Sequence, residues 1–241
     1  MSQAPTYRRI VLKISGECLA AAGPGGGFDA DCLAYAAGQI AAVAAGGTQI
    51  GVVVGAGNLI RGRSLKDIEA INPATADEMG MLATVMNALA LRDALASAGC
   101  DAAVASAIPM DTVAQPIRRQ ALLEQMQSGH VVLLAGGTGS PFCTTDLGAA
   151  FRALQLGADA VFKATKVDGV YDRDPAEHAN ATKYDRLTYE KVLADRLGVM
   201  DMAAVGLCME NDVPILIFRF AEAGQLARAA AGENVGTLIT A

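Results

Sequence analysis

The chain has 241 residues, of which 52% are hydrophobic and 18% charged, and its formal net charge at pH 7 is −6. This acidic balance argues against a surface that binds nucleic acid or anionic membranes, because both depend on basic side chains. The longest weakly polar stretch, 33–47, is shorter than the roughly 18–20 residues of a membrane span, and residues 1–9 lack the apolar segment of a secretory signal.

The cysteine pattern favours a cytoplasmic protein. The five cysteines are odd in number, far apart and form no C-x-x-C pair. That pattern is typical of reduced thiols, and it argues against a disulfide framework and against a zinc site.

Short β-branched runs alternate with helical stretches along the whole chain. Predicted strands lie at 10–14, 49–54, 101–105, 131–135, 159–163, 213–218 and 236–240. Predicted helices lie at 31–45, 74–98, 117–128, 146–156 and 201–210. Continuously apolar strands that alternate with helices indicate an α/β fold, a three-layer αβα sandwich with a mainly parallel central sheet. Ligands of such folds bind beyond the carboxyl ends of the strands, so the residues that follow strands are the candidates.

The first strand contains Lys13 and runs into Ser15 and Gly16. Lysine is uncommon in a buried strand unless its ammonium group meets an anion. Gly16 permits a tight turn in which backbone N–H groups approach a phosphate. A lysine that reaches solvent from the strand end would give the same pattern, so these residues alone leave both interpretations open.

The second strand ends in a glycine-containing segment, 55–62, with Gly55, Gly57 and Arg61. The glycines permit close backbone approach to an anion, and the planar charge of Arg61 suits phosphate oxygens. The segment lacks the third glycine and the downstream acidic residue of a dinucleotide-binding fingerprint, so a dehydrogenase is a poor fit.

The strand at 131–135 leads into a loop, 136–146, that combines glycines with several threonine hydroxyls. Asp146 is placed to cap the helix that follows, and a capped turn is the simplest interpretation. One cap needs one hydroxyl, however, and this loop supplies several. We therefore favour a loop that binds an anion or a substrate.

The segment after the strand at 159–163 has a turn signal at Asp168 and Gly169, followed by Tyr171 and Asp174. Tyr171 and Asp174 could hold a flat base and a ribose, although a solvated hairpin fits the residues as well. P-loop and protein-kinase motifs are absent from the sequence. A kinase whose acceptor is a phosphate needs no histidine base, because a phosphomonoester is mostly dianionic at pH 7, with a second pKa of about 6.

Five segments occur in the order found in one enzyme family. They are Lys-Ile-Ser-Gly-Glu (13–17), Gly-Ala-Gly-Asn-Leu-Ile-Arg-Gly (55–62), Asp-Glu-Met-Gly-Met-Leu-Ala-Thr (77–84), the loop 138–146, and Ala-Thr-Lys-Val-Asp-Gly-Val-Tyr (164–171). Together they resemble the bacterial uridylate kinases of the amino-acid-kinase superfamily, and the resemblance covers nearly the whole chain. It implies a single domain over 1–241, with an acceptor-binding lobe at about 1–155 and an ATP-binding lobe at about 156–241.

Matching positions carry the family's roles onto this chain. The resemblance implies that Lys13 and Arg61 neutralise the transferring phosphoryl group, that Asp146 orients Lys13 or acts through Mg²⁺, and that Asp77 binds the ribose of UMP. The residues implied for ATP are Lys13, Ile14, Ser15, Gly16, Gly57, Arg61, Thr165, Tyr171 and Asp174. The residues implied for UMP are Ala56, Asp77, Thr138, Gly139, Ser140, Pro141, Phe142, Cys143, Thr144 and Thr145.

The resemblance also implies transfer of the γ-phosphoryl group of ATP to UMP, with Mg²⁺ that accompanies ATP; no residue is assigned as a metal ligand from the sequence. It implies a homohexamer in which GTP activates and UTP inhibits. Ser140, Cys143 and Ala56 stand where this family usually has asparagine, phenylalanine and glycine. Two alternatives remain: an amino-acid kinase that forms an acyl phosphate, and a non-catalytic relative that binds a nucleotide or an anion.

Overall fold

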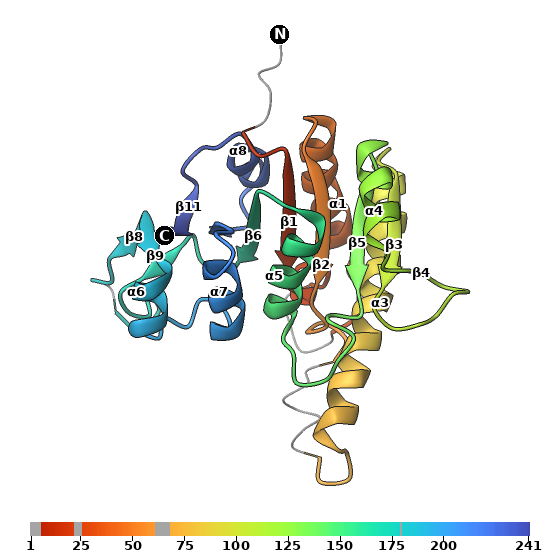
Figure 1. Cartoon of the computed structure of the whole chain (residues 1–241), viewed down its shortest axis with the longest axis horizontal. Helices are drawn as coiled ribbons and strands as arrows, with labels where there is room; N and C mark the ends of the chain where they lie inside the picture. The colour runs from red at the N-terminus through yellow and green to blue at the C-terminus, as the bar shows by residue number, and fades with distance from the viewer. Residues whose placement is uncertain (1–5, 22–25, 61–67, 179) are drawn as a thin grey trace.

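The computed structural model describes residues 6–21, 26–60, 68–178 and 180–241. They build a nine-stranded sheet in the order β4-β3-β5-β2-β1-β6-β10-β11-β9, with β7 and β8 as a separate hairpin (Figure 1). All neighbours in the large sheet are parallel except β10 and β11. The strands are β1 (Arg9–Ile14), β2 (Gln49–Val54), β3 (Ala102–Ser106), β4 (Gln115–Pro116), β5 (Val131–Ala135), β6 (Ala160–Thr165), β7 (Val170–Tyr171), β8 (Lys183–Tyr184), β9 (Arg186–Thr188), β10 (Ile215–Arg219) and β11 (Gly236–Thr240). The predicted fold class is confirmed.

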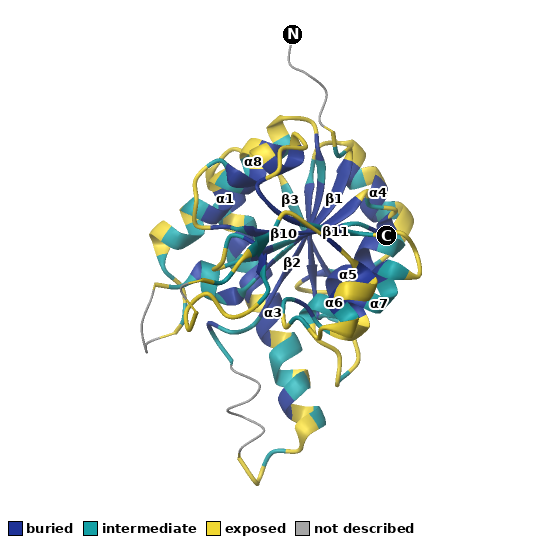
Figure 2. Ribbon diagram, turned by 90° about the vertical axis from the view of Figure 1, so that its left-hand side faces the viewer, coloured by how far each residue is buried: buried dark blue, intermediate teal, exposed yellow. Residues whose placement is uncertain are grey.

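Helices cover both faces of the sheet. One face packs against α1, α3 and α8, and the other against α4, α5, α6 and α7. The bounds are α1 Ala30–Ala45, α3 Pro73–Ser97, α4 Arg119–Gln127, α5 Thr145–Leu156, α6 Tyr189–Ala194, α7 Met202–Met209 and α8 Gln225–Ala230. Figure 2 shows the buried strands at the centre, between these two helical layers.

The two faces bury separate cores because side chains alternate along each strand. In β1, Ile10, Leu12 and Ile14 join the core under α1 and α3, whereas Val11 joins the core under α5. By the same alternation Lys13 lies on the α5 face. This register decides which helix supplies a partner for the lysine.

Strand β1 lies between the two halves of the sheet. It pairs with β2 on one side and with β6 on the other. Every strand that precedes α5 lies on the β2 side, and every strand of the large sheet that follows α5 lies on the β6 side. The division into an acceptor-binding lobe at about 1–155 and an ATP-binding lobe at about 156–241 stays a prediction.

Several short elements were not predicted. They are β4, β7, β8, β9, α6, α8 and the 3-10 helix Gly16–Leu19. All of them span two to six residues, too few for a hydrophobic period to be read. Helix α4 begins at Arg119, two residues after the predicted start, because Gln115 and Pro116 pair with β3 and the amide of Ile117 donates to the carbonyl of Ser106.

Helix α3 extends past the edge of the sheet at which β1 and β5 end (Figures 1 and 2). Leu82 and Met86, one turn apart on this helix, have 48% and 53% of their surface exposed. In the described ranges, every helix falls short of the length or the apolar character needed to cross a membrane.

Candidate active site

Lys13 and Lys163 lie side by side on the α5 face of the sheet, since they are register partners in β1 and β6. Asp146, in the first turn of α5, contacts both. Nζ of Lys13 lies 3.0 Å from Oδ1 of Asp146, and Nζ of Lys163 lies 2.6 Å from Oδ2. Lys163 also donates to the carbonyl of Val199 at 2.6 Å. The anion that the buried position of Lys13 requires is therefore Asp146.

Asp146 is available to the lysines because another residue caps α5. The hydroxyl of Thr144 accepts from the amide of Leu147 at 3.1 Å, which makes Thr144 the N-cap. The prediction that Asp146 caps this helix was wrong. A carboxylate in the first turn is still favoured by the helix dipole, so α5 helps to hold Asp146 ionised.

The electrostatics of the cluster follow from one carboxylate facing two ammonium groups. Burial alone raises the pKa of Asp146, but the charges of Lys13 and Lys163 and the hydrogen bond from Lys163 outweigh it, so this pKa lies below its ordinary value. Burial lowers the pKa of Lys163, and Asp146 offsets this only in part. Together the three side chains carry one net positive charge, which suits an anionic ligand.

Two glycine turns pack against each other beside this cluster. The amide of Gly55 donates to the carbonyl of Ile14 at 2.9 Å. A Cβ atom at Gly16 would lie 2.6 Å from the carbonyl oxygen of Gly55 and 2.9 Å from the amide nitrogen of Gly57, so only glycine fits at position 16. Ser15 caps the short helix that starts at Gly16 by accepting from the amide of Glu17 at 3.3 Å. The two segments predicted to approach phosphates thus form one surface.

A buried pair of asparagines fixes the second glycine turn. The side chains of Asn58 and Asn87 exchange two hydrogen bonds, at 3.0 and 2.8 Å, and Asn87 also donates to the carbonyl of Gly55 at 2.7 Å. Asn58 donates in addition to the carbonyl of Gly27 at 2.8 Å. Asn87 is fully buried on α3, so this helix holds the turn in place.

A cavity of about 320 Å³ opens next to the glycine turns, between α3 and the loop 136–144. Six of the residues predicted for UMP contribute to its lining. They are Ala56, Asp77, Ser140, Cys143, Thr144 and Thr145. Oδ2 of Asp77 accepts from the amide of Phe142 at 2.9 Å, which joins α3 to the loop.

Two further contacts anchor the start of this loop. The amide of Gly136 donates to the hydroxyl of Thr84 at 2.8 Å, and Nη2 of Arg152 donates to the carbonyl of Gly137 at 3.0 Å.

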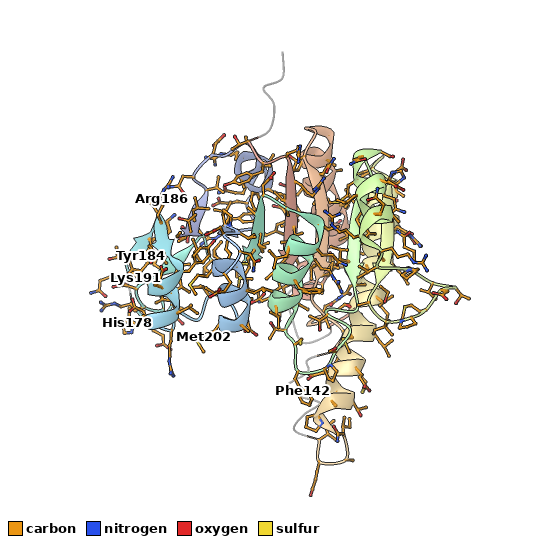
Figure 3. The ribbon with its side chains drawn as sticks, in the orientation of Figure 1. Phe142, His178, Tyr184, Arg186, Lys191 and Met202 are labelled. Carbon is orange, nitrogen blue, oxygen red and sulfur yellow. The ribbon has the colours of Figure 1, made fainter. Side chains whose placement is uncertain are left out.

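Phe142, farther along the same loop, has a backbone φ of 65°. This left-handed conformation is uncommon outside glycine and costs on the order of 1–3 kcal/mol. Its ring points away from the fold, beside α3, and is 73% exposed (Figure 3).

The other predicted acceptor residues lie around the cavity or beyond it. Thr138 lines a neighbouring cavity of about 310 Å³ together with Arg152. Gly139 packs against Ala107, where a Cβ atom would lie 3.3 Å from the alanine. Pro141 is half-buried at the outer part of the loop. Arg61, the second predicted cation, lies outside the described residues.

Three of the residues predicted for the donor nucleotide, Thr165, Tyr171 and Asp174, lie at the end of β6 or after it. Ile14 is buried below the site. The hydroxyl of Thr165 donates to the carbonyl of Val167 at 2.6 Å, and the hydroxyl of Tyr171 donates to Oδ1 of Asp168 at 2.8 Å. Asp174 lies farther along, where Oδ1 accepts from the amide of Ala176 in a local turn and the side chain is exposed. Thr165 and Tyr171 therefore lie near the carboxyl edge, and Asp174 lies in the loop between β7 and β8.

Three residues of the site were missed in the sequence. Lys163 carried the signal that marked Lys13, a lysine within an apolar strand, and could have been found by the same argument. Asn87 and Arg152 lie in the middle of helices, and their partners are far away in the sequence. A single sequence holds no signal for such contacts.

The chain is similar to known proteins in sequence and in fold. Residues 8–219 match the amino acid kinase family. The solved structure of UMP kinase from Bacillus anthracis superposes with a TM-score of 0.93 at 35% identity, covering 97% of this chain and 96% of that one. UMP kinase from Ureaplasma parvum gives 0.91 at 32% identity, covering 97% and 99%. Uridylate kinase from Archaeoglobus fulgidus gives 0.75 at 28%, covering 96% and 99%.

Proposed function

The chain belongs to the amino acid kinase family, and we propose that it is a UMP kinase that transfers the γ-phosphoryl group of ATP to UMP, giving ADP and UDP. The observation that carries the proposal is the position of the cluster of Lys13, Asp146 and Lys163 beside a cavity that contains Asp77. A cationic centre next to a cavity lined in part by serine and threonine side chains suits two phosphorylated ligands that meet end to end.

The step is a direct in-line displacement without a phosphoenzyme. A phosphate oxygen of UMP attacks the γ-phosphorus of ATP, the new P–O bond forms, and the bond from the γ-phosphorus to the bridging oxygen breaks toward ADP. A base is unnecessary because the acceptor phosphate is mostly dianionic. The work of the protein is to place two anions together and to neutralise their repulsion.

Lys13 and Lys163 supply that neutralisation. Asp146 holds one ammonium on each carboxylate oxygen, so both cations stay at fixed positions while the charge moves from the γ-phosphate to ADP. The backbone amides of Ser15, Gly16 and Gly57 add donors at the same place. Arg61 is the further cation that we expect here from the sequence.

The acceptor nucleotide occupies the cavity between α3 and the loop. Asp77 lies on its wall and would bind the ribose hydroxyls, while Ala56 and the residues Thr138 to Thr145 would enclose the base and the phosphate. Mg²⁺ enters as part of the MgATP substrate, in keeping with its usual coordination by substrate phosphates. Thr165, Tyr171 and Asp174 would line the adenine and ribose end of ATP.

The test is an ADP-release assay with MgATP and one acceptor in each reaction: UMP, CMP, dUMP, N-acetylglutamate or aspartate. We expect turnover with UMP far above the other acceptors. Turnover with an amino acid and none with UMP would contradict the acceptor assignment and favour an amino-acid kinase. ATP binding without turnover on any acceptor would identify a non-catalytic relative.

We also infer a homohexamer in the cytoplasm that GTP activates and UTP inhibits, as the family resemblance implies. The exposed apolar pair Leu82 and Met86 on α3 supports self-association, because a monomer would leave both side chains exposed to water. Light scattering gives the assembly, and titration of GTP and UTP into the UMP assay gives the response. A monomer in solution would contradict the first inference, and a rate unchanged by both nucleotides would contradict the second.

A further inference from the structure

A second carboxylate at the carboxyl edge of the sheet is also shared between two cations. Oδ2 of Asp168 lies 3.4 Å from Nζ of Lys183, and Oδ1 lies 3.6 Å from Nη2 of Arg219. The hydroxyl of Tyr171 donates to Oδ1 at 2.8 Å. These four side chains, called the Asp168 cluster below, come from separate elements: the turn after β6, β7, β8 and the end of β10.

The register of the sheet brings Arg219 to the donor side of the site. Arg219 pairs with Thr165, and two residues earlier Ile217 pairs with Lys163. Arg219 therefore lies on the strand next to β6, beside Thr165 and two residues farther toward the carboxyl edge than Lys163. Lys183 belongs to β8, next to Tyr184, which Figure 3 labels.

The Asp168 cluster carries excess positive charge that is open to solvent. Two cations face one carboxylate, and the side chains of Arg219 and Lys183 are 40% and 32% exposed. Other exposed ion pairs of the chain, such as Arg228 with Glu233 and Lys191 with Asp195, match one cation to one carboxylate.

The bond to Arg219 is the loosest in the cluster. At 3.6 Å its guanidinium is beyond hydrogen-bond distance of Asp168, and its Nε is buried without a hydrogen-bond partner in the described part of the chain. A guanidinium with unused donors, in a chain whose net charge is −6, is a site for an anionic oxygen.

We propose that Arg219, assisted by Lys183, binds the end of the donor's polyphosphate that adjoins the ribose and exchanges its loose contact with Asp168 for phosphate oxygens. This assignment rests on the proposed function, because it takes ATP as the donor. It adds a second cationic centre to the one at Asp146. The two centres lie along the same edge, and a triphosphate is a chain of anions that can contact both.

A purely structural role would be to attach the β7–β8 hairpin to the sheet. That attachment already exists without charge, because the amide of Val170 donates to the buried hydroxyl of Thr237 at 2.8 Å and the same hydroxyl donates to the carbonyl of Tyr184. The hairpin therefore does not depend on Arg219. The two roles also predict opposite effects for one substitution of Asp168.

The experiment measures binding of ATP, ADP and adenosine by calorimetry to the full chain and to Arg219→Ala, Arg219→Lys and Asp168→Asn. We expect Arg219→Ala to weaken the binding of ATP roughly tenfold and to leave the binding of adenosine unchanged. The factor is at the lower end of the range for a charged hydrogen bond because the site is partly exposed. Arg219→Lys restores part of the loss. Asp168→Asn keeps an acceptor for the hydroxyl of Tyr171 but removes the negative charge that competes with phosphate for Arg219. We therefore expect ATP to bind severalfold more tightly to this variant.

Arg228→Ala is the matched control, since it removes an exposed arginine from an ion pair on α8. Equal weakening of adenosine and ATP by Arg219→Ala would overturn the proposal, as would weaker ATP binding by Asp168→Asn or an effect of Arg219→Ala no larger than that of the control. Binding is measured without acceptor, so the outcome is separate from turnover on UMP. A chain that binds ATP through Arg219 but fails to use UMP would refute only the proposed acceptor.

Discussion

Nζ of Lys163 lies 2.6 Å from Oδ2 of Asp146, while Lys13 contacts the other oxygen of the same carboxylate at 3.0 Å. The two lysines therefore occupy separate oxygens and do not compete for one. Loss of either lysine would take the net charge of the three side chains from one positive charge to zero. This arrangement makes Lys163 a full member of the proposed phosphoryl site.

Lys163→Met removes one cation and keeps the length of the side chain. We expect kcat for UMP to fall on the order of 10²–10³-fold, the usual loss for one group that stabilises developing charge, with a smaller change in the KM for UMP. Steady-state kinetics measures this. Lys191→Met, on an exposed pair with Asp195, is the control, and an unchanged kcat in Lys163→Met would remove Lys163 from the mechanism.

The lowered pKa of Asp146 predicts how the stability of the fold depends on pH. Its pKa in the folded chain lies below the ordinary value of about 3.9 that it takes on unfolding. The unfolded chain therefore binds the proton more readily, so the contribution of Asp146 is complete above that value and is lost as pH falls through the folded pKa. We expect the gap in unfolding free energy between wild type and Asp146→Asn to stay constant from about pH 7 to pH 5 and to shrink below about pH 4.

Urea denaturation at steps of pH measures that gap. A gap that changes between about pH 7 and pH 5 would place the pKa of Asp146 above its ordinary value, contrary to the effect of two neighbouring ammonium groups.

Asp77→Asn tests the link between α3 and the acceptor loop. The substitution removes the charge that accepts from the amide of Phe142, and with it a charged partner for the ribose. We expect the KM for UMP to rise roughly tenfold and the KM for ATP to stay the same. Asp93→Asn, exposed on the same helix, controls for the loss of a charge. An equal rise in both KM values would contradict a role confined to the acceptor.

Asn87→Leu removes the donor of two buried acceptors, Oδ1 of Asn58 and the carbonyl of Gly55. Each such group costs about 1–3 kcal/mol, so we expect the free energy of unfolding to fall by about 3 kcal/mol. Denaturant titration measures the change. Asn211→Leu, whose amide makes one exposed bond to Leu207, should cost less than about 0.5 kcal/mol. Similar losses in the two variants would show that the buried pair does little to stabilise the fold.

Thr237→Val replaces a buried hydroxyl by a methyl group of the same size. The amide of Val170 then lacks its acceptor, which costs about 1–3 kcal/mol and frees the β7–β8 hairpin from β11. We expect faster hydrogen exchange at the hairpin amides and a higher KM for ATP. Thr48→Val removes a buried hydroxyl that bonds to Tyr7, away from the hairpin. Equal exchange at the hairpin in both variants would contradict the role of Thr237.

The sequence predicted the elements with a clear period and the residues whose chemistry conflicts with their position. Lys13 is the clearest case, because a lysine in an apolar strand demands an anion and Asp146 provides it. The role of Asp146 in capping was predicted wrongly, because Thr144 and Asp146 are both good caps and local preference cannot rank them. Lys163 carried the same signal as Lys13, but its place beside Lys13, like that of Arg219 beside Thr165, depends on the register between strands, which a single sequence does not reveal.

The order of the strands has a consequence for a chain that is still being synthesised. Strands β1, β2, β3 and β5 are neighbours and all precede α5, so this half of the sheet can form while β6 is still unmade. A nascent chain that has reached α5 holds Asp146 and Lys13 but lacks Lys163. The cluster of Lys13, Asp146 and Lys163 is completed only when β6 docks beside β1, so the cavity proposed for the acceptor can form before the cluster proposed for phosphoryl transfer.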